Sequence, residues 1–302
     1  MKRHHRGRTT AACAGSLALL TLLGGCGSSG GATAAPAGAP AAPAAPSAAP
    51  SASAGASAAA PPAGAAGQVP AAAWAKWKVP PLAPAPPAPA DKPVKLTKSG
   101  TVPVISSIPT QQKVVFVTID DGEEKDPKFI EMMSDLKIPI TMFLMDDAIK
   151  NNYDYFKPLQ AAGNSIQNHT LHHPAMSTKS AAVQKTEVCG DQQVLTQKYG
   201  TAPFLFRPPY GDGANTPTLN SAVQQCGPRA VVLWHESMQI HDMQYQNADK
   251  KLRPGDIILA HFRGPKDLKG ETMTEMFGEL LSRIQEQGFS VARLDDYIQP
   301  PS

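Results

Sequence analysis

A stretch that begins as a buried strand and ends in two neighbouring acids constrains the fold of this chain most strongly. Residues 113–122 read Lys113-Val-Val-Phe-Val-Thr-Ile-Asp-Asp-Gly122, and the β-branched and aromatic run at 114–117 is typical of a strand buried on both faces. Asp120 and Asp121 follow at its carboxyl end, where proteins with parallel sheets place their active sites. Neighbouring strand residues point to opposite faces, so the two acids can take different roles. The alternative interpretation is an Asp-Gly turn that only closes a strand.

Segments with strand character alternate with segments of helical periodicity along the rest of the chain. Further strands are expected at 138–145, 165–168, 204–206, 230–234, 257–261 and 290–294, and helices after Asp126-Pro127, at 156–162, 180–199, after Thr216-Pro217, and at 273–287. This order predicts an α/β fold with a mostly parallel sheet, open or closed into a barrel. Polar clusters follow several of these strands, which is the arrangement of a site built at the C-terminal face of a parallel barrel.

The composition of the N-terminal third excludes a packed core there. Half of the 30 prolines lie within residues 31–100, in an Ala/Pro/Ser/Gly background almost free of charge. Such a segment buries too little apolar surface to offset its conformational entropy, so we predict a disordered tether. The sequence Trp74-Ala-Lys-Trp77 interrupts it and either docks on the folded domain, contacts a ligand, or forms a short solvated patch.

The first residues have the pattern of an export signal. Basic residues at positions 2–8 precede an apolar run at 11–23, which is too short to be a comfortable membrane span. The run ends in Leu23-Gly24-Gly25-Cys26, which resembles the bacterial lipobox, whose cysteine is diacylated and becomes the mature N-terminus. An ordinary signal peptide cleaved nearby is the alternative. A lipid on Cys26 would hold the protein extracytoplasmically, on the outer face of the cell membrane.

These features divide the chain into a signal peptide at 1–25, a lipidated cysteine with an Ala/Pro-rich tether at 26–100, and a folded domain at 101–302. Without the signal, 24 basic and 25 acidic residues remain, a net charge of −1. This balance gives no indication of a nucleic-acid-binding face. We expect a monomer.

Two cysteines remain for the folded domain once Cys13 leaves with the signal and Cys26 is lipidated. Cys189 and Cys226 lie on consecutive expected helices, each just before a glycine. An exported, oxidising setting permits a disulfide between them. Two buried free thiols are the alternative.

Histidines supply the second chemical signal. His169 and His173 are four residues apart, so on a helical turn they share one face. Two imidazoles and a carboxylate from the first strand would make a three-ligand site for zinc or a similar divalent ion, with a position left open for water and substrate. His172 could compete for the ligand role, and surface histidines are the alternative interpretation.

The chain resembles the polysaccharide deacetylases of the NodB-homology class, carbohydrate esterase family 4, in four of that family's five ordered motifs. Those motifs appear here as Thr118-Ile119-Asp120-Asp121-Gly122, His169-Thr170-Leu171-His172-His173-Pro174, Arg207-Pro208-Pro209-Tyr210-Gly211 and Leu259-Ala260-His261. The resemblance covers about residues 111–299. It implies a distorted (β/α) barrel with seven or eight strands.

The resemblance also implies a role for each motif residue at the metal and the base. Asp121, His169 and His173 would bind the metal, usually zinc, with cobalt or another divalent ion as alternatives. Asp120 would be the general base that activates the attacking water. Arg207 would hold Asp120 ionised and oriented through a charge-assisted pair.

Further roles concern the leaving group and the acyl group. His261 would protonate the departing amine, because an amine cannot leave readily without a proton. The backbone N–H of Tyr210 would help to stabilise the oxyanion. Trp234 and Leu259 would line the apolar pocket for the acetyl methyl, with plain core packing as the alternative for each.

One motif departs from the family's pattern. After its tryptophan the family usually has an Asp three residues on and another six residues on, and the second tunes the pKa of the acid histidine. Ser237 and Ile240 stand at those places here. We therefore hypothesise that Asp242, or less favourably Glu236, tunes the pKa of His261 after a local shift in the loop.

These patterns predict a metal-dependent hydrolase that removes N-acetyl groups from a cell-wall or extracellular glycan. Peptidoglycan is favoured because the protein would be tethered beneath it. Chitin-like oligomers, a secreted N-acetylglucosamine polymer and O-deacetylation of an acetylated polysaccharide are alternatives within the same chemistry. A catalytically weak glycan-binding wall protein is the alternative of another class.

Overall fold

The computed structural model describes residues 69–301. The signal peptide, the lipidation site at Cys26 and the tether before residue 69 lie outside this range. No helix within residues 69–301 is long and apolar enough to cross a membrane.

One main sheet carries the fold. Its strands are β2 (Val104–Ile105), β3 (Val114–Asp121), β4 (Thr141–Leu144), β5 (Ser165–Asn168), β6 (Leu205–Phe206), β7 (Ala230–Val232), β8 (Glu236–Met238), β9 (Met243–Tyr245), β10 (Ile257–His261) and β11 (Ser290–Val291). The order β2-β7-β6-β5-β4-β3-β10-β8 is parallel throughout, with β9 antiparallel on β8 and β11 paired with the start of β3. A second, two-stranded sheet pairs β1 (Val94–Lys95) with β12 (Ile298–Gln299). The expected α/β fold with a curled parallel sheet is confirmed.

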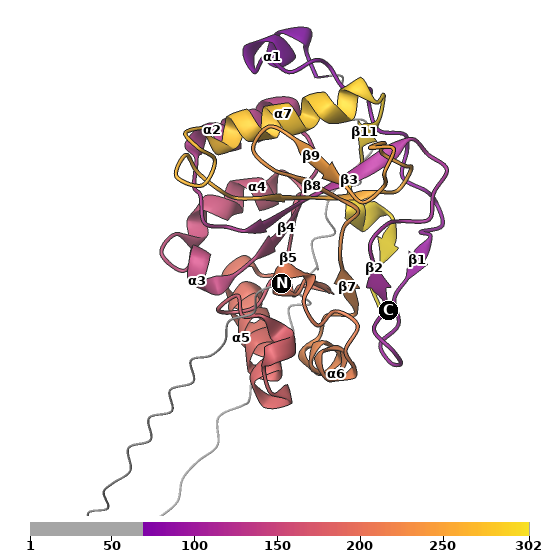
Figure 1. The fold of residues 1–302 in the computed structure, drawn as a ribbon, viewed down its shortest axis with the longest axis vertical. Helices are drawn as coiled ribbons and strands as arrows, with labels where there is room; N and C mark the ends of the chain where they lie inside the picture. Colours follow the sequence, from indigo (N-terminus) through magenta and orange to yellow (C-terminus); the bar gives the residue numbers. More distant parts are fainter. Residues whose placement is uncertain (1–68, 302) are drawn as a thin grey trace, which may run out of the picture. The chain divides into compact units, whose positions relative to one another are not determined.

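Seven α-helices surround this sheet within the described residues. They are α1 (Ala71–Lys76), α2 (Pro127–Leu136), α3 (Asp146–Ile149), α4 (Lys157–Ala161), α5 (Ala181–Tyr199), α6 (Pro217–Cys226) and α7 (Met273–Glu286). Short 3-10 turns occur at Tyr153–Phe156, Met176–Thr178, Pro209–Gly211 and Leu294–Asp296. Figure 1 shows α2 and α7 together on one flank of the sheet, and α5 and α6 together on the opposite flank.

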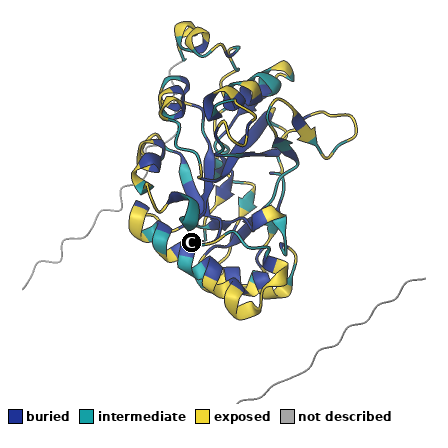
Figure 2. Ribbon diagram, turned by 60° about the vertical axis from the view of Figure 1, so that its left-hand side comes forward, coloured by how far each residue is buried: buried dark blue, intermediate teal, exposed yellow. Residues whose placement is uncertain are grey.

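The core lies on both sides of β3, whose eight residues are all buried. One cluster lies between the sheet and the helices α2 and α7, and a second fills the concave side around Phe116, Phe143 and Leu205. Figure 2 shows most of the central strands as buried and the outward faces of the helices as exposed. Packing on both faces explains why the strand at 114–117 reads as a continuous apolar run.

The two ends of the parallel sheet meet through the segment between β7 and β8. Leu233 N donates to Ile105 O, and His235 N donates to Ile257 O. An isolated antiparallel bridge also joins Ser107 to Asp256. These bonds connect the β2 edge to β10, so the sheet curls into an incomplete barrel.

The ordered fold begins before residue 101, the boundary that we set for the domain. Trp74 of α1 is only 6% exposed and packs in the cluster that includes α2 and α7. Trp77 donates its indole N–H to Asp135 Oδ2 at 2.8 Å, and Lys76 Nζ lies 2.7 Å from Glu131 Oε1. Of the alternatives for this tryptophan pair, the structure shows docking on the domain.

Candidate active site

The polar clusters that follow the strands converge at one end of the sheet. Asp120 and Asp121 end β3, His169 follows β5, Arg207 follows β6, and His261 ends β10. The register places Asp120 beside His261 on the neighbouring strand. Because these strands are parallel and adjacent, residues far apart in the sequence share one opening.

Three side chains form a cluster that could hold a metal ion. Ligand atoms of Asp121, His169 and His173 all lie within 4.8 Å of one another. Asp121 Oδ1 lies 3.4 Å from His169 Nε2 and 3.3 Å from His173 Nε2. This buried oxygen has no hydrogen-bond partner among the described residues. Two imidazole nitrogens and one carboxylate oxygen fit a divalent ion such as zinc.

Neighbouring groups set the charge of Asp121 and the tautomer of His169. Burial disfavours the carboxylate of Asp121, but interactions with His169 and His173 outweigh it and hold the pKa of Asp121 well below its usual range. His169 Nδ1 lies 2.7 Å from the carbonyl oxygen of Arg207. An N–H on Nδ1 would leave Nε2 unprotonated and directed at Asp121, as a metal ligand requires.

His172 does not join the cluster. Its Nδ1 lies 2.9 Å from Glu187 Oε1, and 57% of its side chain is exposed. The hydrogen bond with Glu187 raises the pKa of His172, against the smaller effect of burial. The structure thus places His173, and not His172, beside Asp121.

The backbone of the site is strained at four non-glycine residues. Asp121, Thr170, His173 and Tyr210 have φ values of 71°, 77°, 55° and 61°. Such left-handed conformations cost about 1–3 kcal/mol each, and they tend to cluster at functional sites. At Asp121 this conformation breaks the strand alternation, so the different roles of the two acids do not follow from opposite strand faces alone.

Asp120 is paired with a fully buried arginine. Arg207 Nη1 donates to Asp120 Oδ1 at 2.7 Å and to Thr118 Oγ1 at 2.8 Å. The guanidinium carbon lies 4.2 Å from the centre of the Phe143 ring and 5.5 Å from that of Trp234. Asp120 Oδ2 points towards the metal cluster, 3.7 Å from His169 Nε2. One carboxylate oxygen is therefore held by arginine and the other faces the reaction centre.

His261 is half-buried beside Asp120 and lines a small cavity with Met238 and Arg263. Burial lowers the pKa of His261, and the carboxylates of Asp120 and Asp121 only partly oppose this shift.

The segment after Trp234, which departs from the family's pattern, supplies no acid that pairs with His261 among the described residues. Asp242 is exposed in the turn between β8 and β9, and no hydrogen bond or ion pair joins it to His261 in residues 69–301. Its tuning role stays a hypothesis. The buried side chain of Glu236 lies next to Asp256, and no hydrogen bond or ion pair within residues 69–301 joins it to His261, so this alternative also stays a hypothesis.

The remaining predicted residues surround the same opening. Tyr210 is 71% exposed, and its ring centre lies 4.7 Å from that of His173. Leu259 is buried one layer below His261, beside Thr118 of β3. Trp234 is half-buried over Arg207. These positions fit an apolar floor and wall next to the reacting atoms.

Sequence reasoning missed three residues that contact the site. Arg263 Nη2 lies 3.9 Å from Asp121 Oδ2. Asp191 and Glu187 of α5 accept hydrogen bonds from the backbone N–H groups of His169 and His172. A signal for the last two was present, because two acids four residues apart share a face of the expected helix at 180–199.

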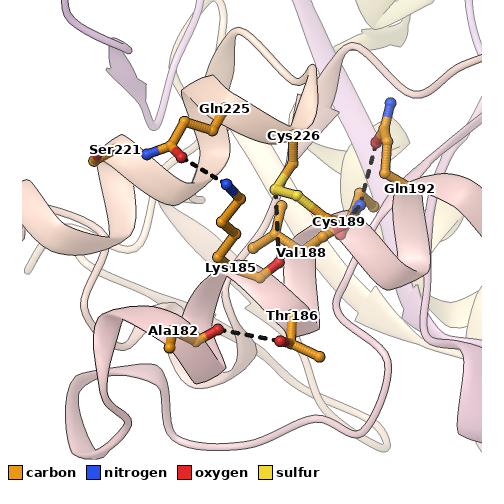
Figure 3. The surroundings of a disulfide bond; sticks show 10 residues. Ala182, Lys185, Thr186, Val188, Cys189, Gln192, Ser221, Gln225 and Cys226 are labelled. Carbon is orange, nitrogen blue, oxygen red and sulfur yellow. Dashed lines mark hydrogen bonds between the residues drawn. A yellow bond between two sulfur atoms is a disulfide. The ribbon is translucent and has the colours of Figure 1, made fainter.

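The two cysteines of the domain form the expected disulfide. Cys189 of α5 and Cys226 of α6 are bonded, with their Cα atoms 4.7 Å apart. Figure 3 shows the bridge between the two helices, next to the hydrogen bond between Lys185 and Gln225.

Comparison with known proteins assigns the family. A family model described as polysaccharide deacetylase matches residues 107–231. An uncharacterized protein of Streptomyces coelicolor is 36% identical over 197 residues, which are 65% of this chain and 77% of that protein. The peptidoglycan-N-acetylglucosamine deacetylase of Bacillus cereus is 22% identical over 63% of this chain and 70% of that protein.

A solved structure supports the fold independently. A family 4 carbohydrate esterase pseudoenzyme from Bacillus anthracis superimposes with a TM-score of 0.54 and 19% identity, over 66% of this chain and 71% of that chain. At this level of identity the likeness concerns the fold alone. The motif residues, the site and these comparisons agree, and the chain belongs to the polysaccharide deacetylase family of hydrolases, the NodB-homology class.

Proposed function

We propose that this protein is a metal-dependent deacetylase that removes N-acetyl groups from N-acetylglucosamine-type residues of a cell-wall or extracellular polysaccharide, with peptidoglycan favoured. One observation carries the proposal. A buried acid–arginine pair, a cluster of two histidines and an aspartate, and a histidine from a neighbouring strand surround one opening. These are the parts that hydrolysis of an amide requires.

Asp121, His169 and His173 would hold the metal, and zinc is favoured because two imidazoles and one carboxylate suit its tetrahedral site with an open position. When bound, the ion would supply the Lewis acidity that makes water nucleophilic near neutral pH. The buried, unpartnered Oδ1 of Asp121 supports this assignment.

Asp120 takes the proton from the attacking water. The oxygen not bonded to Arg207 faces the opening, so it can accept the proton while the other oxygen stays paired. Arg207 is fully buried and cannot contact a substrate, so its role is to orient Asp120.

The C–N bond of the amide then breaks as His261 donates a proton to the departing sugar amine, and acetate is the second product. The exposed, left-handed Tyr210 turn presents a backbone N–H for the oxyanion. Leu259 and Trp234 would accommodate the acetyl methyl group. Because burial lowers the pKa of His261, less of it carries the proton than would be so for an exposed histidine, and we expect a slow enzyme.

The test is acetate release by residues 27–302 from N-acetylglucosamine oligomers and from purified peptidoglycan. The assay is repeated after chelation, after zinc or cobalt is added back, and with Asp120→Asn. Asp249→Asn, an exposed acid away from the site, is the matched control. Metal-restored release that is lost only in Asp120→Asn supports the proposal, and the preferred substrate distinguishes the wall from a free glycan.

Failure has two forms. Acetate release from an O-acetylated polysaccharide alone would replace the N-deacetylase by an O-deacetylase. No release from any substrate, with glycan binding retained, would favour a binding protein. The absence of the family's two acids at Ser237 and Ile240 is the feature that supports this alternative.

We further propose that Cys26 is lipidated and holds the protein at the outer face of the cell membrane. The basic, apolar and Leu-Gly-Gly-Cys pattern supports this assignment. Labelling with a fatty-acid analogue should mark the wild-type protein and not Cys26→Ser. Equal labelling of both, or of neither, would refute the anchor.

A further inference from the structure

The loop that carries both histidine ligands does not hold its conformation unaided. Thr170 and His173 are in the left-handed region, with φ values of 77° and 55°. A β-branched residue such as Thr170 is a genuine outlier there. Each such residue costs about 1–3 kcal/mol and persists only when its surroundings impose it. Within the loop, His173 N–H donates to Thr170 Oγ1 and Thr170 N–H donates to Asn168 Oδ1, both at 3.1 Å. Contacts from outside the loop add to these two bonds.

Two buried carboxylates of α5 provide such contacts. Asp191 Oδ2 accepts from the backbone N–H of His169 at 3.1 Å, and Glu187 Oε2 accepts from that of His172 at 2.9 Å. Glu187 Oε1 also lies 2.9 Å from His172 Nδ1. Asp191 is 0% exposed and Glu187 is 7% exposed. A buried N–H that loses its acceptor is costly, so the bonds to Asp191 and Glu187 both oppose relaxation of the loop.

Close packing accompanies these hydrogen bonds. The side chain of Asn168 donates to Val188 O at 2.9 Å and to Gln192 Oε1 at 3.2 Å. A Cβ on Gly190 would lie 2.3 Å from Leu171 Cδ1, so any larger residue there would require the Leu171 side chain to move. The loop residues 168, 169, 171 and 172 thus all contact one short segment of α5, residues 187–192.

The disulfide lies within that segment. Cys189 stands between Glu187 and Asp191 in the sequence and ties α5 to Cys226 at the end of α6. A shift of α5 along its axis would move both carboxylates relative to the histidines. The bridge opposes such a shift because it links α5 covalently to α6, which packs against α5 (Figure 3).

We propose that Glu187 and Asp191 are positioning residues that hold the His169–His173 loop in its strained conformation, with the Cys189–Cys226 bridge fixing the helix that carries them. The inference rests on the proposed metal site. Neither carboxylate is part of the cluster of possible ligands, so both act through the backbone of the loop.

The test measures metal affinity rather than turnover. Zinc affinity of full-length protein is determined by competition with a chromophoric chelator, for wild type, Glu187→Ala and Asp191→Ala. Glu286→Ala, an exposed acid on α7, is the control. Circular dichroism establishes that each metal-free variant is folded. We expect both α5 variants to bind zinc about 10- to 100-fold more weakly, which is the usual effect of losing an outer-shell partner.

A purely structural role predicts something different. It would lower the thermal stability of the metal-free variants and leave the zinc affinity of the folded protein unchanged. If Asp191→Ala does not fold, Glu187→Ala decides the question, because Glu187 is less completely buried than Asp191. Glu187→Gln keeps an acceptor for the His172 N–H and should recover most of the affinity.

Affinities within about twofold of wild type in folded Glu187→Ala and Asp191→Ala would overturn the inference. If wild type itself binds no zinc, the proposed function fails instead, so the two failures are distinguishable. The double variant Cys189→Ser/Cys226→Ser should also bind zinc several-fold more weakly. If this variant is less stable but binds zinc with unchanged affinity, the bridge stabilises the fold and does not position the loop.

Discussion

Glu236 should make the free energy of unfolding depend on pH, and this dependence can be measured without substrate. Its side chain is fully buried in β8, and no donor among residues 69–301 reaches either carboxylate oxygen. Burial, then the neighbouring charge of Asp256, raise the pKa of Glu236 from 4.5 to about 8. The protonated form can donate a hydrogen bond to Asp256, which the ionised form cannot.

The direction of the effect follows from proton binding. Between pH 4.5 and about 8 the native state holds a proton on Glu236 that the unfolded chain has lost. The stability from this group is therefore fully present below pH 4.5, declines as the pH rises, and is lost above about pH 8. One pKa unit corresponds to about 1.4 kcal/mol, so the full loss would approach about 5 kcal/mol. Relaxation and water entry reduce it, and we expect about 2–5 kcal/mol.

The perturbation is Glu236→Gln, which is similar in size and cannot ionise. Urea unfolding of metal-free wild type and variant is followed by tryptophan fluorescence from about pH 5 to about pH 9. As the pH rises, the free energy of unfolding of wild type should fall relative to that of the variant. Glu286→Gln, an exposed substitution on α7, should show no such trend. A difference between wild type and Glu236→Gln that is constant with pH would refute the reasoning.

Three further predictions concern the site, the disulfide and the N-terminal segment. Asp120→Asn should lower kcat by about 10²- to 10⁴-fold while chelator competition gives nearly unchanged zinc affinity, and activity within tenfold of wild type would contradict its role as base. Cys189→Ser/Cys226→Ser should lower the free energy of unfolding by about 3–4 kcal/mol in oxidising buffer, and equal urea midpoints would show that the bridge does not stabilise the fold. Trp74→Ala should cost about 3–5 kcal/mol in the same assay because its side chain is buried, whereas an unchanged midpoint would mean that α1 does not dock in solution.

Helix ends were predictable because capping is local. The helix expected at 180–199 is α5, Ala181–Tyr199, with the Ser180 side chain accepting from Val183 N and Gly200 closing it in the left-handed region. The Asp126-Pro127 pair likewise begins α2. Each of these signals acts within one helical turn, so the sequence contains all that is needed to find them.

Strand ends were less predictable because a strand lasts only as long as a partner lies beside it. The strand expected at 138–145 is β4, Thr141–Leu144, whose residues lie opposite β3 and β5. The strand expected at 290–294 shortens to β11, Ser290–Val291, which meets only the start of β3. Apolar character continues beyond these ends, but the ladder of paired residues does not.

The sequence by itself determined the family, the order of the elements and the residue types at the site, since motifs and periodicity are local patterns. Only the tertiary structure could show that His173 rather than His172 faces Asp121, that the buried Glu236 lies beside Asp256, and that α5 contacts the histidine loop. It also decided that α1 docks, although its surroundings in the sequence resemble a linker. These outcomes depend on contacts between residues far apart in the chain, and the free energy of such contacts exists only once the sheet has brought them together.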